Sequence, residues 1–131
     1  MATIFTKIVN SEIPCYRIAE NDKFLAFLDI NPLAKGHSLV IPKQETDYIF
    51  DLQDDLLAEM MVFAKKVALA IESVVPCNRI GLAVLGLEVP HAHIHLVPIN
   101  READISFSKE RIKLTDEEFS MLAEEISNKI Q

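Results

Sequence analysis

Three of the four histidines in this chain, His91, His93 and His95, stand two residues apart with apolar residues between them. Side chains alternate across a β-strand, so this spacing places the three imidazoles on one face and the apolar residues on the other. A helix would scatter the same rings around its axis. The apolar and β-branched neighbours favour the strand. The sequence therefore predicts a strand with one chemical face and one face buried in the core.

One chemistry for such a strand is metal binding, because neutral imidazole is a good ligand for zinc, copper or iron. Three imidazoles and a water would make a catalytic zinc site, and Glu88 could support the ligands from behind. An extended strand, however, separates alternate side chains by roughly 6–7 Å. The rings of His91 and His95 would be too far apart to share one small ion, so a further ligand would have to come from elsewhere.

The alternative chemistry is nucleophilic catalysis by the middle imidazole. At neutral pH much of the histidine is unprotonated and carries a free lone pair. The natural electrophile is phosphorus, because the flanking imidazoles can donate hydrogen bonds to its oxygens and protonate a departing group. A third interpretation, three structural or merely exposed histidines, fits poorly with strict alternation between apolar residues, because buried polar groups need partners.

Composition narrows the class of protein. The chain has 131 residues, half of them apolar, and a net charge of −7. This length fits one domain, and an acidic chain without a basic cluster is a poor candidate for binding nucleic acid or an anionic membrane. Cys15 and Cys77 are far apart and lack metal-ligand spacing. No signal peptide or membrane span is visible, so we expect a cytoplasmic protein.

The pattern along the chain predicts an α+β fold with an antiparallel sheet, because strands and helices do not alternate as βαβ units. Apolar residues recur at helical spacing from Asp54, and Pro76 ends that helix. Thr115 and Glu118 form a capping-box pattern at the start of the last helix. The expected order is a helical turn at 4–8, paired strands at 24–29 and 37–42, a helix at 54–75, a central strand at 79–85, the histidine strand, and a helix at 115–130.

Three blocks of this sequence resemble the histidine triad (HIT) family. The family signature alternates three histidines with apolar residues and ends in two apolar residues, and His-Ala-His-Ile-His-Leu-Val at 91–97 fits it at every position. The segment 27–43 is similar to the family's Asp-Ile-x-Pro-x-x-x-Gly-His-x-Leu-Val-Ile-Pro-Lys block, and the opening at 4–14 is similar to Ile-Phe-x-Lys-Ile-x-x-x-Glu-Ile-Pro. Three ordered blocks are far more specific than the histidine triplet alone, and they weaken the metal interpretation.

The resemblance implies a nucleotidyl hydrolase or transferase that cleaves nucleoside 5′-phosphoramidates, with purines favoured, or dinucleoside polyphosphates. His93 would attack the α-phosphorus and form a covalent nucleotidyl-histidine. His95 would contact the phosphate oxygens or the leaving atom. His91 would orient His93 through its backbone carbonyl, which fixes the tautomer, and His37 would support the triad.

The resemblance also implies how the substrate is bound. Asp29 matches the acid that binds ribose hydroxyls, and Glu88 falls at a position that touches phosphate. The positions that match the apolar base pocket are Ile4, Phe5, Ile8, Phe27 and Ile30. Neither a metal nor another cofactor is expected. The implied fold is a single HIT-like domain over 1–131, with a five-stranded sheet, one long central helix and a C-terminal helical extension from about 101. It would form a homodimer through helix and sheet.

The chain departs from the family pattern just before the triad. Many members carry an Asn-x-Gly-x-x-x-Gly-Gln stretch there, and this chain keeps only Gly86. Ile80 and Leu87 replace polar residues, and Glu88 stands where a hydroxyl residue is common. A carboxylate beside a phosphate is unfavourable. These replacements motivate a second hypothesis, a nucleotide-binding module with weak catalysis.

A further departure lies at the opening of the chain. Some relatives begin a structural zinc site there with Cys-x-x-Cys, and Thr3 and Thr6 occupy those places. The resemblance therefore implies no such zinc site in this chain.

Overall fold

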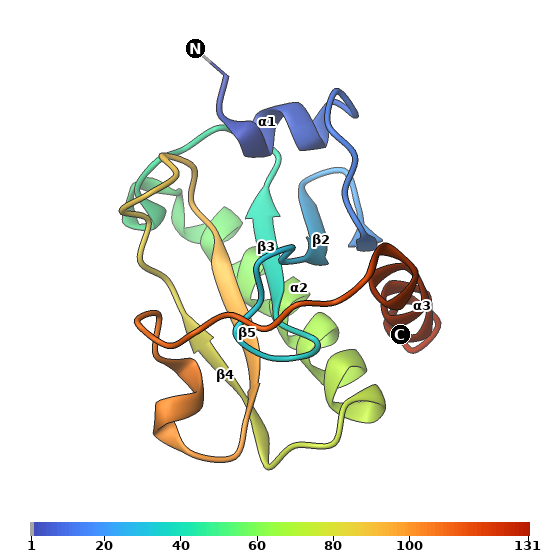
Figure 1. Ribbon diagram of the computed structural model, residues 1–131. Helices are drawn as coiled ribbons and strands as arrows, with labels where there is room; N and C mark the ends of the chain where they lie inside the picture. The colour runs from blue at the N-terminus through green and yellow to red at the C-terminus, as the bar shows by residue number, and fades with distance from the viewer. Residues whose placement is uncertain (1) are drawn as a thin grey trace.

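The computed structural model describes residues 2–131 and forms one antiparallel sheet with helices around it (Figure 1). No helix in this part of the chain is long and apolar enough to span a bilayer. In chain order the helices and strands are α1 (Ile4–Val9), β1 (Arg17–Glu20), β2 (Phe24–Leu28), β3 (Ser38–Pro42), the 3₁₀ turn η1 (Ile49–Asp51), α2 (Asp54–Val74), β4 (Arg79–Ala83), β5 (Ile94–Ile99), the 3₁₀ turn η2 (Glu102–Ile105) and α3 (Asp116–Ser127).

The five strands lie in the order β1-β2-β3-β5-β4, which confirms the predicted α+β class and the five-stranded antiparallel sheet. The pairing of β2 with β3 was expected from the turn residues between them, and Ala26 lies opposite Val40 in this hairpin. At Gly36 the backbone φ is +95°, a conformation that L side chains rarely adopt. A Cβ there would also meet the Val75 side chain at 3.0 Å, so both the turn and the packing favour glycine.

Strand β4 is an edge strand, which corrects the prediction of a central one. Its nearly continuous apolar run suggested burial on both faces, but β4 pairs only with β5. Leu82 is 46 % exposed as a result. Gly81 lies under η2, because a Cβ at this position would meet the Ile105 side chain at 3.0 Å. The apolar run therefore belongs to a strand that η2 covers on one face, and not to a strand flanked by two others.

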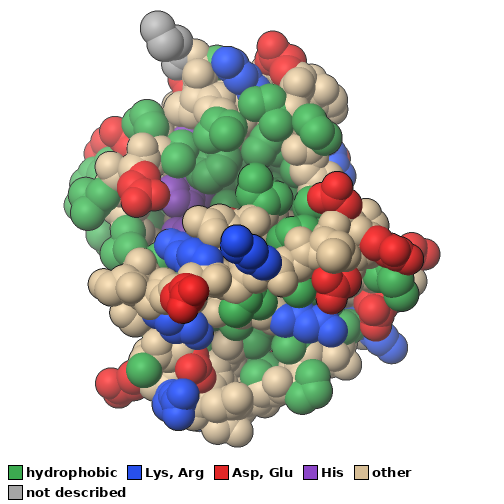
Figure 2. All heavy atoms as spheres, viewed as in Figure 1, with side chains coloured by type: hydrophobic (Ala, Val, Ile, Leu, Met, Phe, Trp, Pro, Cys, Tyr) green, Lys and Arg blue, Asp and Glu red, His purple; other side chains and the backbone are tan. Residues whose placement is uncertain are grey.

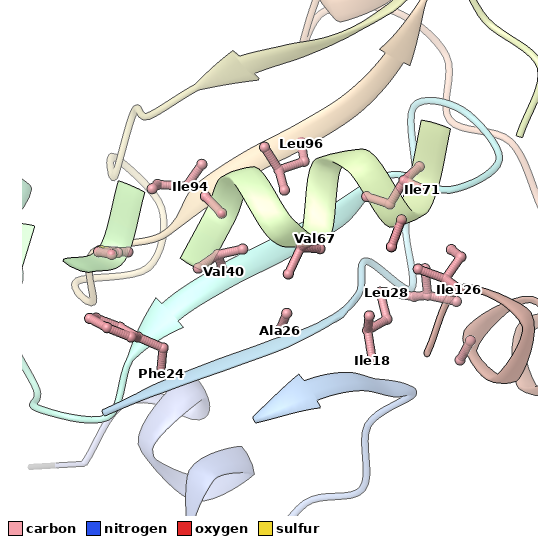
Figure 3. Close-up of a cluster of buried hydrophobic side chains, with 14 of the residues drawn as sticks. Ile18, Phe24, Ala26, Leu28, Val40, Val67, Ile71, Ile94, Leu96 and Ile126 are labelled. Atoms are coloured by element: carbon pink, nitrogen blue, oxygen red, sulfur yellow. The ribbon is translucent and has the colours of Figure 1, made fainter. Parts of the chain in front are cut away.

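The main core fills the space between the sheet and α2, the long central helix (Figure 3). Alternate residues of β2 point to α2, and Val67 and Ile71 on the predicted apolar stripe of that helix are fully buried against them. Helix α3 closes the β1 end of this core with Ile126. It begins at the predicted capping box, in which Thr115 and Glu118 each bond to the other's backbone N–H.

A smaller apolar cluster covers the opposite face of the sheet beneath α1. It contains Phe5, Ile8, Leu25, Phe27, Leu39 and Ile41. Both faces of β2 are therefore covered, and all five of its residues are buried. After η2, the chain crosses this second face on its way to α3, as the orange-to-red segment of Figure 1 shows. Helix α1 and this segment thus border the same side of the sheet, whereas α3 packs against the main core.

Candidate active site

The three aligned histidines straddle the start of β5. The strand begins at Ile94, so only His95 lies within it, and His91 and His93 belong to the extended segment before it. Pairing with β3 ends at Ile94, which leaves the preceding residues without a strand partner. The prediction of one strand through all three histidines is therefore corrected. The rings of His93 and His95 still lie together, with centroids 4.8 Å apart.

His91 is the buried member of the triad, with no exposed surface. Its Nε2 lies 2.9 Å from the carbonyl oxygen of Pro42, at the end of β3. A carbonyl only accepts, so Nε2 carries the proton and Nδ1 must accept. The hydroxyl of Thr3 donates to that Nδ1 at 2.9 Å. Burial lowers the pKa of His91, which favours this neutral form.

His93 has one ring nitrogen, Nε2, without a hydrogen-bond partner among the described residues. Its Nδ1 lies 2.7 Å from the backbone carbonyl oxygen of His91, the hydrogen bond that the resemblance implied. Since that carbonyl only accepts, the proton of the neutral ring is on Nδ1 and Nε2 keeps its lone pair. The ring of Phe5 packs edge-on against His93, with centroids 5.0 Å apart. The ring is thus held by one hydrogen bond and one aromatic wall.

A second pair of imidazoles has the opposite arrangement. The backbone N–H of Leu33 donates to Nδ1 of His37 at 2.9 Å, so the neutral ring carries its proton on Nε2. That Nε2 donates to Nδ1 of His95 at 3.0 Å. The neutral ring of His95 therefore carries its proton on Nε2, as a donor. Burial lowers the pKa of His37 to about 3 and that of His95 to about 4, so both rings are neutral at pH 7.

Asp29 lies at the end of β2 beside these rings. One of its carboxylate oxygens accepts from the backbone N–H of Asn31 at 2.8 Å, and the other lies 3.5 Å from Nε2 of His37. Burial raises its pKa, while the Asn31 N–H and the charge of Arg111 work against that rise.

A cavity of about 480 Å³ opens between α1, the end of β2 and the segment before β5. Figure 2 shows histidine visible among hydrophobic side chains on this face. The sequence-predicted residues that line it are His93, His95, Asp29, Ile4, Phe5, Ile8, Phe27, Ile30 and Glu88. His91 and His37 lie behind the lining. The backbone carbonyl of His91 accepts from His93, and Nε2 of His37 donates to His95, so each supports one residue of the wall. The structure thus brings all eleven predicted site residues to one place, nine at the wall and two in support.

Comparison with known proteins identifies the family. The HIT domain family model matches residues 10–102. Over 134 aligned residues the chain is 39 % identical to an adenosine 5′-monophosphoramidase of Schizosaccharomyces pombe, covering the full length of both chains. It is 40 % identical to an adenosine 5′-monophosphoramidase of Saccharomyces cerevisiae over 101 residues, which cover 74 % of this chain and 62 % of that protein. This chain belongs to the HIT family.

Solved structures agree with this assignment. A HIT-like protein of Bartonella henselae has a TM-score of 0.82 at 29 % identity, over 97 % of this chain and 95 % of that one. A histidine triad nucleotide-binding protein of Sulfolobus tokodaii has a TM-score of 0.81 at 32 % identity, over 96 % and 90 %. The sheet and the helices around it are therefore those of the HIT fold.

Whether this HIT site suits a metal ion depends on which imidazole nitrogens keep a lone pair facing the site. Asp29, His37 and His95 bring three potential ligand atoms within 4.8 Å of one another. A metal would need the lone pair of His37 Nε2, but the Leu33 N–H already takes the lone pair of Nδ1. The neutral ring must then carry its proton on Nε2, which faces the other two groups. The tautomers that these hydrogen bonds require therefore fit a hydrogen-bond chain better than a metal centre.

The tail contributes two site residues that the sequence patterns did not indicate. The ring of Phe107 packs against His95 with centroids 4.6 Å apart, and the guanidinium of Arg111 lies 5.7 Å from the Phe107 ring centre. Arg111 also donates to the carbonyl oxygen of Asn31 at 2.7 Å. Within residues 2–131, Arg111 is the one lysine or arginine that lines the cavity. No motif of the HIT family as matched here extends to these positions.

Two of the departures before the triad, Leu87 and Glu88, lie at the mouth of the cavity, whereas Ile80 lies on β4 and packs against the main core. Leu87 is 93 % exposed and Glu88 is exposed beside it. Gly86 adopts a φ of +76°, which a larger side chain would resist, although its surroundings are open. The carboxylate of Glu88 is therefore at the solvent-facing rim, where water lowers the cost of its charge.

Proposed function

We propose that this HIT protein hydrolyses nucleoside 5′-phosphoramidates, purines favoured, through a covalent nucleotidyl-His93 intermediate. Membership of the family and similarity to proteins named as phosphoramidases support a nucleotide hydrolase. The observation that carries the finer proposal is the bond from His93 Nδ1 to the His91 carbonyl, which leaves Nε2 unprotonated at the cavity wall. An imidazole in this state is a nucleophile at neutral pH.

In the first step, Nε2 of His93 attacks the α-phosphorus and the bond from phosphorus to the leaving nitrogen breaks. The leaving nitrogen takes a proton from solvent as that bond breaks, so the amine departs neutral, while Nε2–H of His95 donates a hydrogen bond to the phosphate oxygens. The nucleotidylated ring of His93 carries a positive charge, and the His91 carbonyl stabilises it through the Nδ1 proton. In the second step, water attacks the phosphorus, the bond to Nε2 breaks, and the proton that the water loses returns to solvent.

Substrate binding divides between an apolar and a polar end of the cavity. Phe5, Ile8 and Phe27 offer an apolar slot suited to a purine ring. The carboxylate of Asp29 accepts from the ribose hydroxyls at the other side. We also propose that two copies associate as a homodimer along the outer edge of β4, because within residues 2–131 this edge pairs with no strand.

One observation favours dinucleoside polyphosphates as a second candidate substrate. The guanidinium of Arg111 is the cationic group at the cavity wall in residues 2–131, and a polyphosphate carries more negative charge than a phosphoramidate. Both reactions use the same nucleotidyl half and differ in the leaving group. Glu88 at the rim favours instead a binding module with weak turnover.

The test compares wild type and His93→Ala with adenosine 5′-phosphoramidate in the presence of EDTA. We expect metal-independent turnover by the wild type and a loss of about a thousandfold or more in the variant, because the attacking group is gone. Mass spectrometry of quenched wild-type protein would find the adenylyl group on His93. AMP binding by the variant, measured by calorimetry, controls for folding. Full turnover by His93→Ala would exclude the covalent mechanism, and binding without wild-type turnover would favour the binding module.

A further inference from the structure

A threonine outside the cavity holds the buried ring of the triad. Thr3 is the N-cap of α1, and its Oγ1 accepts from the backbone N–H of Thr6 at 3.1 Å. The same hydroxyl lies 2.9 Å from Nδ1 of His91. The carbonyl of Pro42 fixes the His91 proton on Nε2, so Nδ1 can only accept and the Thr3 hydroxyl donates. Thr3 therefore completes the hydrogen bonding of an imidazole that has no solvent-exposed surface.

The carboxylate of Glu45 ties this threonine to the end of β3. Oε1 of Glu45, just beyond the end of β3, accepts from the backbone N–H of Thr3 at 3.0 Å and from the hydroxyl of Thr6 at 2.5 Å. The bond from Thr6 lowers the pKa of Glu45, so the acceptor is charged at neutral pH. Charge-assisted hydrogen bonds are stronger than neutral ones. One carboxylate thus fixes the first turn of α1 relative to the sheet.

The position of His91 determines the state of the nucleophile. Its backbone oxygen, 2.7 Å from Nδ1 of His93, decides which nitrogen of that ring carries the proton. Phe5, in the same turn of α1, packs edge-on against both rings, with centroids 5.8 Å from His91 and 5.0 Å from His93. A shift of α1 would therefore move the His91 ring, the carbonyl that holds His93 and a wall of the cavity together.

We propose that Thr3 and Glu45 are positioning residues that hold His91 so that its carbonyl keeps the proton of His93 on Nδ1 and the attacking nitrogen bare. The inference rests on the function proposed above, since it assigns a role in that reaction. Neither residue lines the cavity in the described part of the chain, so they act through His91 and do not touch the substrate. Helix capping alone would give stability without this effect on His93.

The first experiment measures kcat and KM for adenosine 5′-phosphoramidate in Thr3→Val, Thr3→Ser and Glu45→Gln. We expect kcat to fall about tenfold in the valine and glutamine variants, with KM within about twofold, which is the rate equivalent of one lost hydrogen bond. Thr3→Ser keeps the hydroxyl and should retain wild-type kcat. If Thr3→Val fails to fold, Glu45→Gln carries the same test without removing a packed methyl group.

The chain supplies a matched control in α3. Glu118 accepts from the backbone N–H of Thr115 at 2.9 Å, and the Thr115 hydroxyl caps Glu118 N–H at 3.1 Å, with no histidine involved. Thr115→Val and Glu118→Gln therefore remove the same capping chemistry and should leave kcat unchanged. An equal loss of kcat in these controls would show that capping alone matters and would overturn the inference.

The second experiment reads the imidazoles directly by ¹⁵N NMR of the ring nitrogens. In the wild type we expect His93 to be protonated on Nδ1 and His91 on Nε2, and we expect Thr3→Val to give a mixture at His93. This signal requires no turnover, so it tests positioning even if His93→Ala remains active and the proposed reaction is wrong. Unchanged ring signals together with wild-type kcat in both Thr3→Val and Glu45→Gln would overturn the inference.

Discussion

Adjacent imidazoles at the wall of the cavity have opposite protonation patterns, and the backbone sets both. His93 receives its pattern from a carbonyl, while His95 receives its own through His37 from the N–H of Leu33. The ring centroids of His93 and His95 are 4.8 Å apart, so a lone pair and a proton donor stand side by side. Main-chain groups do not titrate, so the backbone fixes which nitrogen of each neutral ring carries the proton.

At the same scale, Arg111 provides a test of the leaving group. Arg111→Gln should lower kcat/KM for a dinucleoside polyphosphate about tenfold more than kcat/KM for adenosine 5′-phosphoramidate, because the guanidinium interacts with the additional phosphate charge. The measurement is the ratio of the two kcat/KM values in wild type and variant. Arg101→Gln is the matched control, since that arginine is 81 % exposed at η2 and does not line the cavity.

An unchanged ratio in Arg111→Gln would remove the observation that favours polyphosphates. An equal loss on both substrates would instead indicate that Arg111 supports the site through Asn31, whose carbonyl it contacts. Either result would leave the phosphoramidate as the better supported substrate class.

At the scale of elements, the outer edge of β4 is the proposed dimer interface. Leu82 on this strand is 46 % exposed, and the outer edge of β4 has no strand partner among residues 2–131. If two copies pair there, Leu82→Glu should raise the dimer dissociation constant tenfold or more, at about the energy of one well-buried interface residue. Light scattering during gel filtration across a concentration series gives the constant.

Met121→Glu on α3 serves as the control, because Met121 is also exposed but lies on the helix at the β1 end of the sheet. A wild type that is monomeric throughout the concentration series would contradict the proposed dimer. A dimer that Leu82→Glu leaves intact would place the interface elsewhere.

Local patterns were enough to predict most elements. The hairpin of β2 and β3 followed from a Pro-Gly turn between apolar runs, and α3 followed from Thr115 and Glu118. Strand β1 has four residues, of which Ile18 alone is buried, so it carries no clear period. The edge position of β4 depends on strand order, which the spacing of residues within one segment does not encode.

The same limit applies to the site. The His93 to His91 bond could be predicted because both partners lie in one short motif. Thr3 reaches His91 across 88 residues of sequence, and Arg111 reaches Asn31 across 80. Only the packing of α1 and of the tail on the sheet brings these groups together. Sequence spacing therefore predicted the candidate nucleophile, but not the residues that position its neighbours or that line the cavity from the C-terminal segment.

At the scale of the whole molecule, buried neutral histidines link the site to stability. The pKa of His37 is lowered from 6.5 to about 3 and that of His95 to about 4. Between these values and 6.5 the unfolded chain binds protons that the folded chain does not, so the free energy of unfolding must fall as the pH falls. Asp29, whose pKa is raised, acts in the opposite direction.

We therefore expect the free energy of unfolding to drop by about 2–3 kcal/mol between pH 7 and pH 5, at up to about 1.4 kcal/mol per pH unit for each histidine. Urea titrations at several pH values measure it. His37→Gln should flatten the slope by about a third to a half, because it removes one of the three histidines whose pKa burial lowers. Stability that is constant or rises over this interval would contradict the burial of neutral imidazoles.

The bond from Leu33 to His37 makes exchange of the Leu33 amide proton depend on the position of the His37 ring. A backbone N–H that ends on an imidazole is protected from exchange with solvent deuterium only while that ring stays in place. Leu33 itself is fully buried, so its amide proton leaves only when the turn after β2 opens. Its exchange rate therefore reports how often the hydrogen-bonded pair of His37 and His95 opens. A nucleotide that closes the site would slow this exchange.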